Sequence, residues 1–129
     1  MQNNELNGKR KFDLEDRLID FAIKVIAIVE LIPASRAGNH IAGQLVRSGT
    51  SPALNYGEAQ SAESRNDFIH KMKICLKELR ETKISLKIIY KKPLIQELEI
   101  VQKLITENDE LISIFMKSIS TATENKKTS

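Results

Sequence analysis

Apolar residues recur along this chain every three or four positions, and no stretch alternates apolar and polar residues with a period of two. A spacing of three to four places apolar side chains on one face of an α-helix, whereas half-buried strands need a period of two. The pattern therefore predicts an all-α protein. Prolines and polar breaks divide it into four helices, at about residues 13–32, 36–62, 64–91 and 94–119.

The segment 64–91 has the most regular pattern. Its seam residues are spaced alternately by four and three: Phe68, Met72, Cys75, Leu79, Thr82, Leu86 and Ile89. This spacing is typical of a helix that packs along its whole length against nearly parallel neighbours. At 1.5 Å per residue the helix would be roughly 40 Å long, which favours a bundle over a small globule of crossed helices.

The segment 94–119 repeats this spacing, with Asn108 as its one polar seam residue. A lone polar residue in such a seam can fix the register of packing at some cost in stability. Pro93 is expected in the first turn of this helix, where its missing N–H does no harm. The third and fourth helices should then be joined by a very short connection and run antiparallel. The polar ends of the chain, before residue 12 and from Ser120 onward, are expected to be loose.

The stretch RSGTSPALNYGEAQSAES, residues 47–64, holds two glycines and a proline and could be a loop. Loops of that length are uncommon in compact domains. An alternating spacing of four and three continues through this stretch, at Ile41, Leu45, Ser48, Pro52, Asn55 and Ala59. Each glycine costs up to about 1 kcal/mol in a helix relative to alanine. Close approach of a neighbouring helix is one way to offset that cost. The sequence thus predicts a helix with small residues along its seam.

Length and charge add two constraints. The chain has 129 residues, the size of one domain. No stretch approaches the ~20 uncharged apolar residues of a membrane span, and the N-terminal MQNNELNGKRKF lacks the apolar core of a signal peptide, so we expect a cytoplasmic protein. The net charge is +3, but residues 65–92 hold nine lysines and arginines against three acids, a net +6. Such asymmetry indicates either an anionic partner or a merely solvated helix face.

The cations of segment 64–91 gather in a stripe offset from the seam. Together with Arg47, the candidate nucleic-acid contacts are Lys73, Lys77, Arg80, Lys87 and Lys91. No aromatic residue interleaves with them, so binding would depend on phosphate contacts and be salt-sensitive, without base stacking. The alternative is that Glu78 and Glu81 pair with the lysines and the face only confers solubility.

A second polar stripe runs along the helix at 36–62. Its members are spaced by four, four and three: Arg47, Ser51, Asn55 and Glu58. They could form a ligand site. The favoured interpretation is a structural network, with Glu78 and Glu81 as candidate partners, because buried polar groups must find hydrogen-bond partners.

Nothing in the sequence indicates catalysis. The single Cys75 excludes an internal disulfide and a multi-cysteine metal site. Carboxylate-bridged di-metal bundles need Glu-x-x-His pairs, but Ala37 and Asp67 stand three residues before His40 and His70. No glycine-rich phosphate loop follows a strand. We therefore expect no metal, no cofactor and no enzymatic activity.

One combined pattern points to a known family. Its residues are Arg47-Ser48, Ser51, Asn55-Tyr56-Gly57-Glu58-Ala59, Ser64, Phe68, Lys77-Glu78 and Glu81-Thr82. Over roughly residues 12–118 the chain resembles the four-helix-bundle proteins encoded within intervening sequences of bacterial 23S rRNA genes. These are related to the accessory variability protein of diversity-generating retroelements. The resemblance implies an up-down-up-down antiparallel four-helix bundle and a ring-shaped homopentamer.

Two functions remain open at this level. The first is a non-catalytic oligomer that binds nucleic acid, in particular structured RNA, through the basic face. The second is an interaction scaffold that docks a partner protein, with the basic face incidental. The related retroelement proteins, which are similar basic pentamers, bind both nucleic acid and a reverse transcriptase. No membrane partner is expected.

Overall fold

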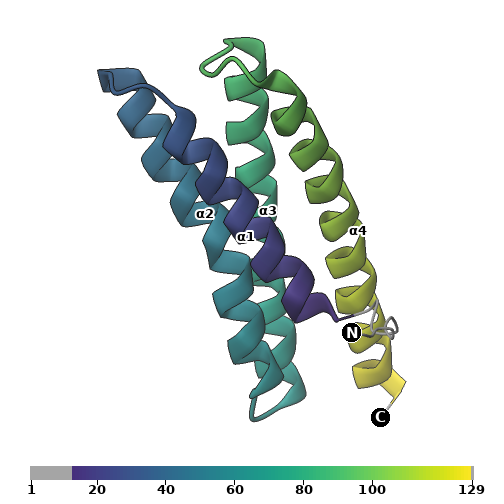
Figure 1. The fold of residues 1–129 in the computed structure, drawn as a ribbon. Coiled ribbons are helices and arrows are strands. Elements are labelled where there is room, and N and C mark those ends of the chain that lie inside the picture. The colour runs from purple at the N-terminus through teal and green to yellow at the C-terminus, as the bar shows by residue number, and fades with distance from the viewer. Residues whose placement is uncertain (1–12, 129) are drawn as a thin grey trace, which may run out of the picture.

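The computed structural model describes residues 13–128. Four helices follow one another along the chain: α1 (Leu14–Leu31), α2 (Arg36–Gln60), α3 (Arg65–Lys91) and α4 (Leu98–Thr128). They run alternately up and down as an antiparallel bundle (Figure 1), which confirms the predicted fold class. Helix α3 packs against α2 and α4, and α1 packs against α2 and less extensively against α4. Helices α1 and α3 therefore lie diagonally opposite each other.

Local capping signals set the beginnings of the first three helices. The side chain of Asp13 accepts a hydrogen bond from the Asp16 N–H at 3.2 Å. Ser35 Oγ and Ser64 Oγ do the same for α2 and α3, at 2.8 Å and 3.0 Å. Each cap satisfies a backbone donor that the first helical turn leaves unpaired. Because these signals are local, the predicted bounds of these three helices agree with the structure to within two residues.

Helix α4 differs from its predicted bounds of 94–119 at both ends. The Leu94 N–H donates to the Ile89 carbonyl at 3.1 Å, which closes the end of α3. Ile95 is then buried within the connection, so α4 begins only at Leu98 and Pro93 does not lie in its first turn. At the other end the helix continues to Thr128, with Ala122 and Thr123 half-buried. The expected loose segment from Ser120 is therefore helical, whereas the expected loose segment before residue 12 lies outside the described residues.

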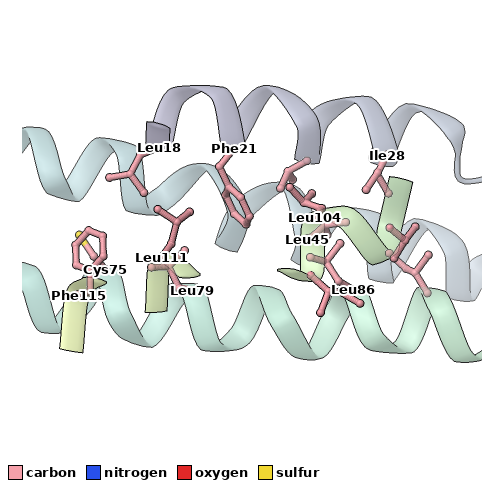
Figure 2. Packing of buried hydrophobic residues seen from close by; sticks show 14 of the residues in the cluster. Leu18, Phe21, Ile28, Leu45, Cys75, Leu79, Leu86, Leu104, Leu111 and Phe115 are labelled. Carbon is pink, nitrogen blue, oxygen red and sulfur yellow. The ribbon is translucent and has the colours of Figure 1, made fainter. Parts of the chain in front are cut away.

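The core lies along the bundle axis and is built from all four helices. Figure 2 shows Leu18, Phe21 and Ile28 of α1 pointing towards α3, with Leu79 and Leu86 on the opposite side. Helix α4 buries four residues of its predicted seam, Val101, Ile105, Asn108 and Phe115, and also Leu104 and Leu111, because it faces α1 as well as α3. Among the described residues, no helix has the length and apolarity needed to cross a membrane.

Helix α2 continues through the stretch that could have been a loop. It is helical from Arg36 to Gln60 with Pro52 inside it. The expected close approach holds at Gly49, where an added Cβ would lie 2.7 Å from the Val25 methyl groups. It does not hold at Gly43 and Gly57, where an added Cβ would meet no atom of the described chain within 4 Å.

Polar groups within the seams are hydrogen-bonded. Ser48 and Thr82, both buried, join α2 to α3 through their hydroxyls at 2.9 Å. Thr82 also donates its hydroxyl proton to the Glu78 carbonyl at 2.8 Å. Because a hydroxyl has only one proton to donate, Ser48 is then the donor in its hydrogen bond with Thr82. With its amide nitrogen facing α3, Asn108 donates to the Leu79 carbonyl at 3.1 Å and accepts from the Lys83 N–H at 3.3 Å. These contacts fix the registers of α2 and α4 on α3.

Candidate nucleic-acid interface

The side of α3 that points away from the core is fully open to solvent. We call it the α3 outer face; its exposed residues are Lys73, Lys77, Arg80, Ile84, Lys87, Ile88 and Lys91. Helix α2 covers one flank of α3 and α4 covers the other, and no further helix of the described chain packs against this third side. The five cations predicted from the sequence thus share one surface, and Glu81 lies at its α2 edge, beside Lys77 and Arg80.

The acids of α3 lie on its α2 flank, where Arg47 binds both. Arg47 Nη1 donates to Glu78 at 3.0 Å and Nη2 donates to Glu81 at 2.8 Å. Glu78 is only 6% exposed, so its charge needs a partner inside the protein. Hydrogen bonding by Arg47 lowers the pKa of the Glu81 carboxyl below its usual value. The charge of Arg47, a predicted phosphate contact, is therefore balanced by two carboxylates. These are the partners that the sequence analysis named for it.

The other residues of the predicted stripe do not join that network. Asn55 donates to the carbonyl and the hydroxyl of Ser51, at 3.0 Å and 2.9 Å, within its own helix. Glu58 instead pairs with Lys71 of α3 at 2.7 Å. The predicted stripe is thus divided into three separate contacts, all of which are internal to the bundle.

The cations of the α3 outer face differ in how closely they approach acidic or other polar groups of the same chain. Lys77 Nζ lies 3.8 Å from Glu78 and 3.7 Å from Glu81. Arg80 contacts only the Met116 sulfur, at 3.5 Å. Lys73, Lys87 and Lys91 form no ion pair with any described residue. Lys83, which lies off this face, is neutralised by Asp109 at 2.8 Å. The cations that an external anion can reach most freely are therefore Lys73, Arg80, Lys87 and Lys91.

Two apolar residues lie among these cations and were missed by the sequence reasoning. Ile84 is 59% exposed and Ile88 is 42% exposed. The spacing carried the signal, because the cation stripe advances seven positions from Arg80 to Lys87, and Ile84 lies on the same side of the helix between them. The outer face is therefore amphipathic as well as basic.

The described residues offer no arrangement typical of a metal or nucleophilic site. No group of three or more histidine, cysteine, aspartate or glutamate side chains could hold a metal ion within the part of the chain that the structure describes. His40 and His70 are exposed on different helices. Cys75 is fully buried, and burial raises the pKa of its thiol to about 12. Its thiol donates only to the Pro52 carbonyl, at 3.5 Å.

A hollow lies at the end of the bundle where α1 and α3 begin and α2 and α4 end. It has a volume of about 740 Å³ and is bounded by Leu14, Tyr56, Phe68 and Ile114 together with the last turns of α4. Arg17 lies at its edge and is held by Glu107 at 2.8 Å and Glu110 at 2.7 Å. These bonds raise the pKa of the arginine above its usual value. The charge of Arg17 is therefore balanced by the two carboxylates of α4.

Comparison with known proteins assigns the family. A family model described as 23S rRNA-intervening sequence protein matches residues 10–117. The chain belongs to this family. A comparison with curated proteins finds no match. Among solved structures, the chain is similar to a Bacteroides thetaiotaomicron protein of unknown function from the S23 ribosomal protein family, with a TM-score of 0.74 and 28% identity. The match covers 81% of this chain and 96% of the other.

Membership in the intervening-sequence family confirms the resemblance seen in the sequence, and its matched range is close to the range of 12–118 expected there. The match includes α1, α2, α3 and most of α4. The Arg47–Glu78–Glu81 network and the α3 outer face both lie within it. The family assignment therefore applies to the helices that carry the candidate interface.

Proposed function

We propose that this intervening-sequence protein is a non-catalytic, self-associating, cytoplasmic bundle that binds structured RNA through the α3 outer face. The observation that carries the proposal is the separation of charge on α3. Five cations occupy its exposed side, while Glu78 and Glu81 are turned to the α2 flank and bound by Arg47. A surface on which cations outnumber acids attracts a polyanion, and attraction to phosphates dominates nucleic-acid affinity.

The shape of the face favours a structured RNA over readout of bases. The cations from Lys73 to Lys91 lie along a single helix and span roughly 27 Å at 1.5 Å per residue. The α3 outer face carries no aromatic side chain on which a base could stack. Proteins recognise RNA helices mainly by shape and by contacts to phosphates and 2′-hydroxyls. We assign the phosphate contacts to Lys73, Arg80, Lys87 and Lys91, with a smaller contribution from Lys77.

Fluorescence anisotropy with a labelled RNA hairpin tests the proposal. Four phosphate contacts predict that affinity falls roughly 100-fold between 50 and 200 mM salt. The double variant Lys87→Glu, Lys91→Glu should weaken binding and reduce the salt slope by about 2. The double variant Lys103→Glu, Lys117→Glu on α4 changes the net charge equally but leaves the face intact, and serves as the control. Equal losses in both variants, or affinity independent of salt, would contradict the assignment.

One observation favours a second candidate function, a scaffold that docks another protein. The exposed side chains of Ile84 and Ile88 contribute nothing to phosphate binding, yet they occupy the centre of the basic surface. A protein partner would bury them. Such a partner could be a reverse transcriptase, as the retroelement relatives imply, or another copy of the chain, as the proposed homopentamer requires. Binding that depends on Ile84 and resists salt would support this candidate over RNA.

A further inference from the structure

A hollow lies between α1 and α4, the two adjacent helices that pack least extensively against each other. It has a volume of about 240 Å³, and its apolar lining is Ala27 and Ile28 of α1 with Ile100 and Leu104 of α4. Ile28 and Leu104 belong to the core in Figure 2 and are almost completely buried, whereas Ile100 is 38% exposed. The hollow therefore extends from the surface of the bundle to its core. We call it the α1–α4 groove.

Three charged side chains border the α1–α4 groove, and their balance is positive. Glu107 is neutralised by Arg17, whose Nη2 and Nε lie 2.8 Å and 2.9 Å from the carboxylate oxygens. Lys24 of α1 is paired at 3.2 Å with Asp20, and both side chains of this pair are exposed. Lys103 of α4 forms no ion pair with any described residue. Because an exposed ion pair contributes little free energy, both lysines are available to an anion at the groove.

The lining of the groove specifies the chemistry of a ligand. Ligand sites in helical bundles lie between helices and combine apolar walls with a few polar groups that orient the ligand. An apolar cavity of roughly 150 Å³ already holds a benzene molecule, and the α1–α4 groove is larger. Its apolar residues are all aliphatic, so an aromatic ligand would find no ring to stack on. Its one cation without an acidic partner matches a ligand with a single negative charge.

We propose that the α1–α4 groove binds a free alkyl carboxylate of medium chain length. The chain lies on Ile28, Ile100 and Leu104, and the carboxylate accepts hydrogen bonds from the amines of Lys24 and Lys103. The groove contains no residue of α3. This inference is therefore independent of the RNA binding proposed for the α3 outer face.

A series of straight-chain carboxylates tests the fit of the apolar chain. Binding of hexanoate, octanoate and decanoate to the full-length protein can be measured by isothermal titration calorimetry. Each methylene that becomes buried raises the affinity about fourfold, so the affinity should rise with chain length until the groove is full and then level off. No binding of decanoate at millimolar concentration, or an affinity that does not depend on chain length, would overturn the proposal.

The contribution of the lysines is tested by changing the charge on either side of the contact. Octanol lacks the carboxylate and should bind more weakly than octanoate. Lys103→Met keeps the apolar stem of the lysine but removes its charge, so it should weaken octanoate binding roughly threefold to tenfold and leave octanol binding unchanged. Lys117→Met, on the same helix but outside the groove, is the matched control and should bind octanoate normally. Equal losses in the two variants would contradict the assigned contact.

A substitution that fills the groove tests its location. Ala27 is exposed at the groove, so the indole of Ala27→Trp should lie across it and abolish octanoate binding without creating a cavity. Ile26→Trp is the matched control, because Ile26 is 42% exposed and does not line the groove. Circular dichroism checks that both variants are folded. Octanoate binding that survives in Ala27→Trp, or that is lost equally in both variants, would refute the proposed site.

The same variants identify other occupants of the groove. If no carboxylate binds and Ala27→Trp lowers the mass of the assembly in light scattering, a second copy covers the groove and the proposal fails. If the unmodified chain floats with phosphatidylglycerol vesicles and Ala27→Trp does not, the groove takes up lipid from a bilayer, and a free carboxylate is not its ligand.

Measurement of RNA binding keeps this inference separate from the proposed function. Octanoate and Ala27→Trp should both leave the affinity for the RNA hairpin unchanged, because the α3 outer face is a different surface. If octanoate binds and the hairpin does not, the groove proposal stands and the RNA proposal fails. If the hairpin binds and no carboxylate does, the groove proposal fails and the RNA proposal stands.

Discussion

The backbone of Gly49 in α2 lies directly against the side chain of Val25 in α1. A Cβ at position 49 would be 2.7 Å from both valine methyl groups, and Val25 is completely buried. A β-branched side chain in a helix is held to one rotamer, so Val25 cannot turn away. Glycine at position 49 thus permits α1 and α2 to pack as closely as they do.

This contact predicts opposite effects for alanine at different glycines of α2. Gly49→Ala should lower the free energy of unfolding by about 1–3 kcal/mol, as overpacking does. Gly43→Ala and Gly57→Ala should each raise it by about 0.4–1 kcal/mol, because their new methyl groups enter open space and the unfolded chain loses freedom. Urea unfolding at neutral pH measures all three. A Gly49→Ala protein as stable as the original would show that α1 moves to accommodate the methyl group.

The Arg47 pair predicts a specific loss of stability in acid. Hydrogen bonding by Arg47 lowers the folded-state pKa of Glu81 from its usual 4.5. The stability that this lowered pKa contributes is therefore fully present above pH 4.5, and it is lost as the pH falls through the folded-state pKa. Arg47→Met should therefore lower the urea midpoint at pH 7 and flatten its decline between pH 5 and pH 3. Lys24→Met, which removes only an exposed pair with Asp20, should leave that decline unchanged. An unaltered acid profile in Arg47→Met would contradict the coupling.

The burial of Cys75 predicts an unreactive thiol. Burial raises its pKa to about 12, and the thiolate is the form that reacts. A thiol reagent at pH 8 should therefore label it only when the bundle opens, roughly 10³-fold or more slowly than the unfolded chain. Ser61→Cys, at an exposed position after α2, should react at once. Comparable rates for the two thiols would mean that α2 and α3 separate readily around Cys75.

The candidate site was predicted in part. The five cations of the α3 outer face follow from helical spacing alone, because residues three and four apart share a side of a helix. The sequence left two roles open for Arg47, a phosphate contact and the favoured pairing with Glu78 and Glu81, because a helix side that carries a cation looks the same whether or not an acid from another helix reaches it; the structure shows the pairing. The exposed isoleucines on α1 and α3 were also missed, because apolar residues in a helical pattern are ordinarily assigned to the core.

The sequence by itself determined the four helices, the seam of α3 and the caps at Asp13, Ser35 and Ser64, because these depend on residues within one or two turns of each other. The tertiary structure decided the rest. Packing buries Ile95 in the connection, so α4 starts at Leu98. Packing also buries Leu104 and Leu111 of α4 beside its predicted seam. It also bound Glu78 and Glu81 to Arg47. Each of these outcomes depends on which surfaces of different helices meet, and that is settled only when the bundle packs.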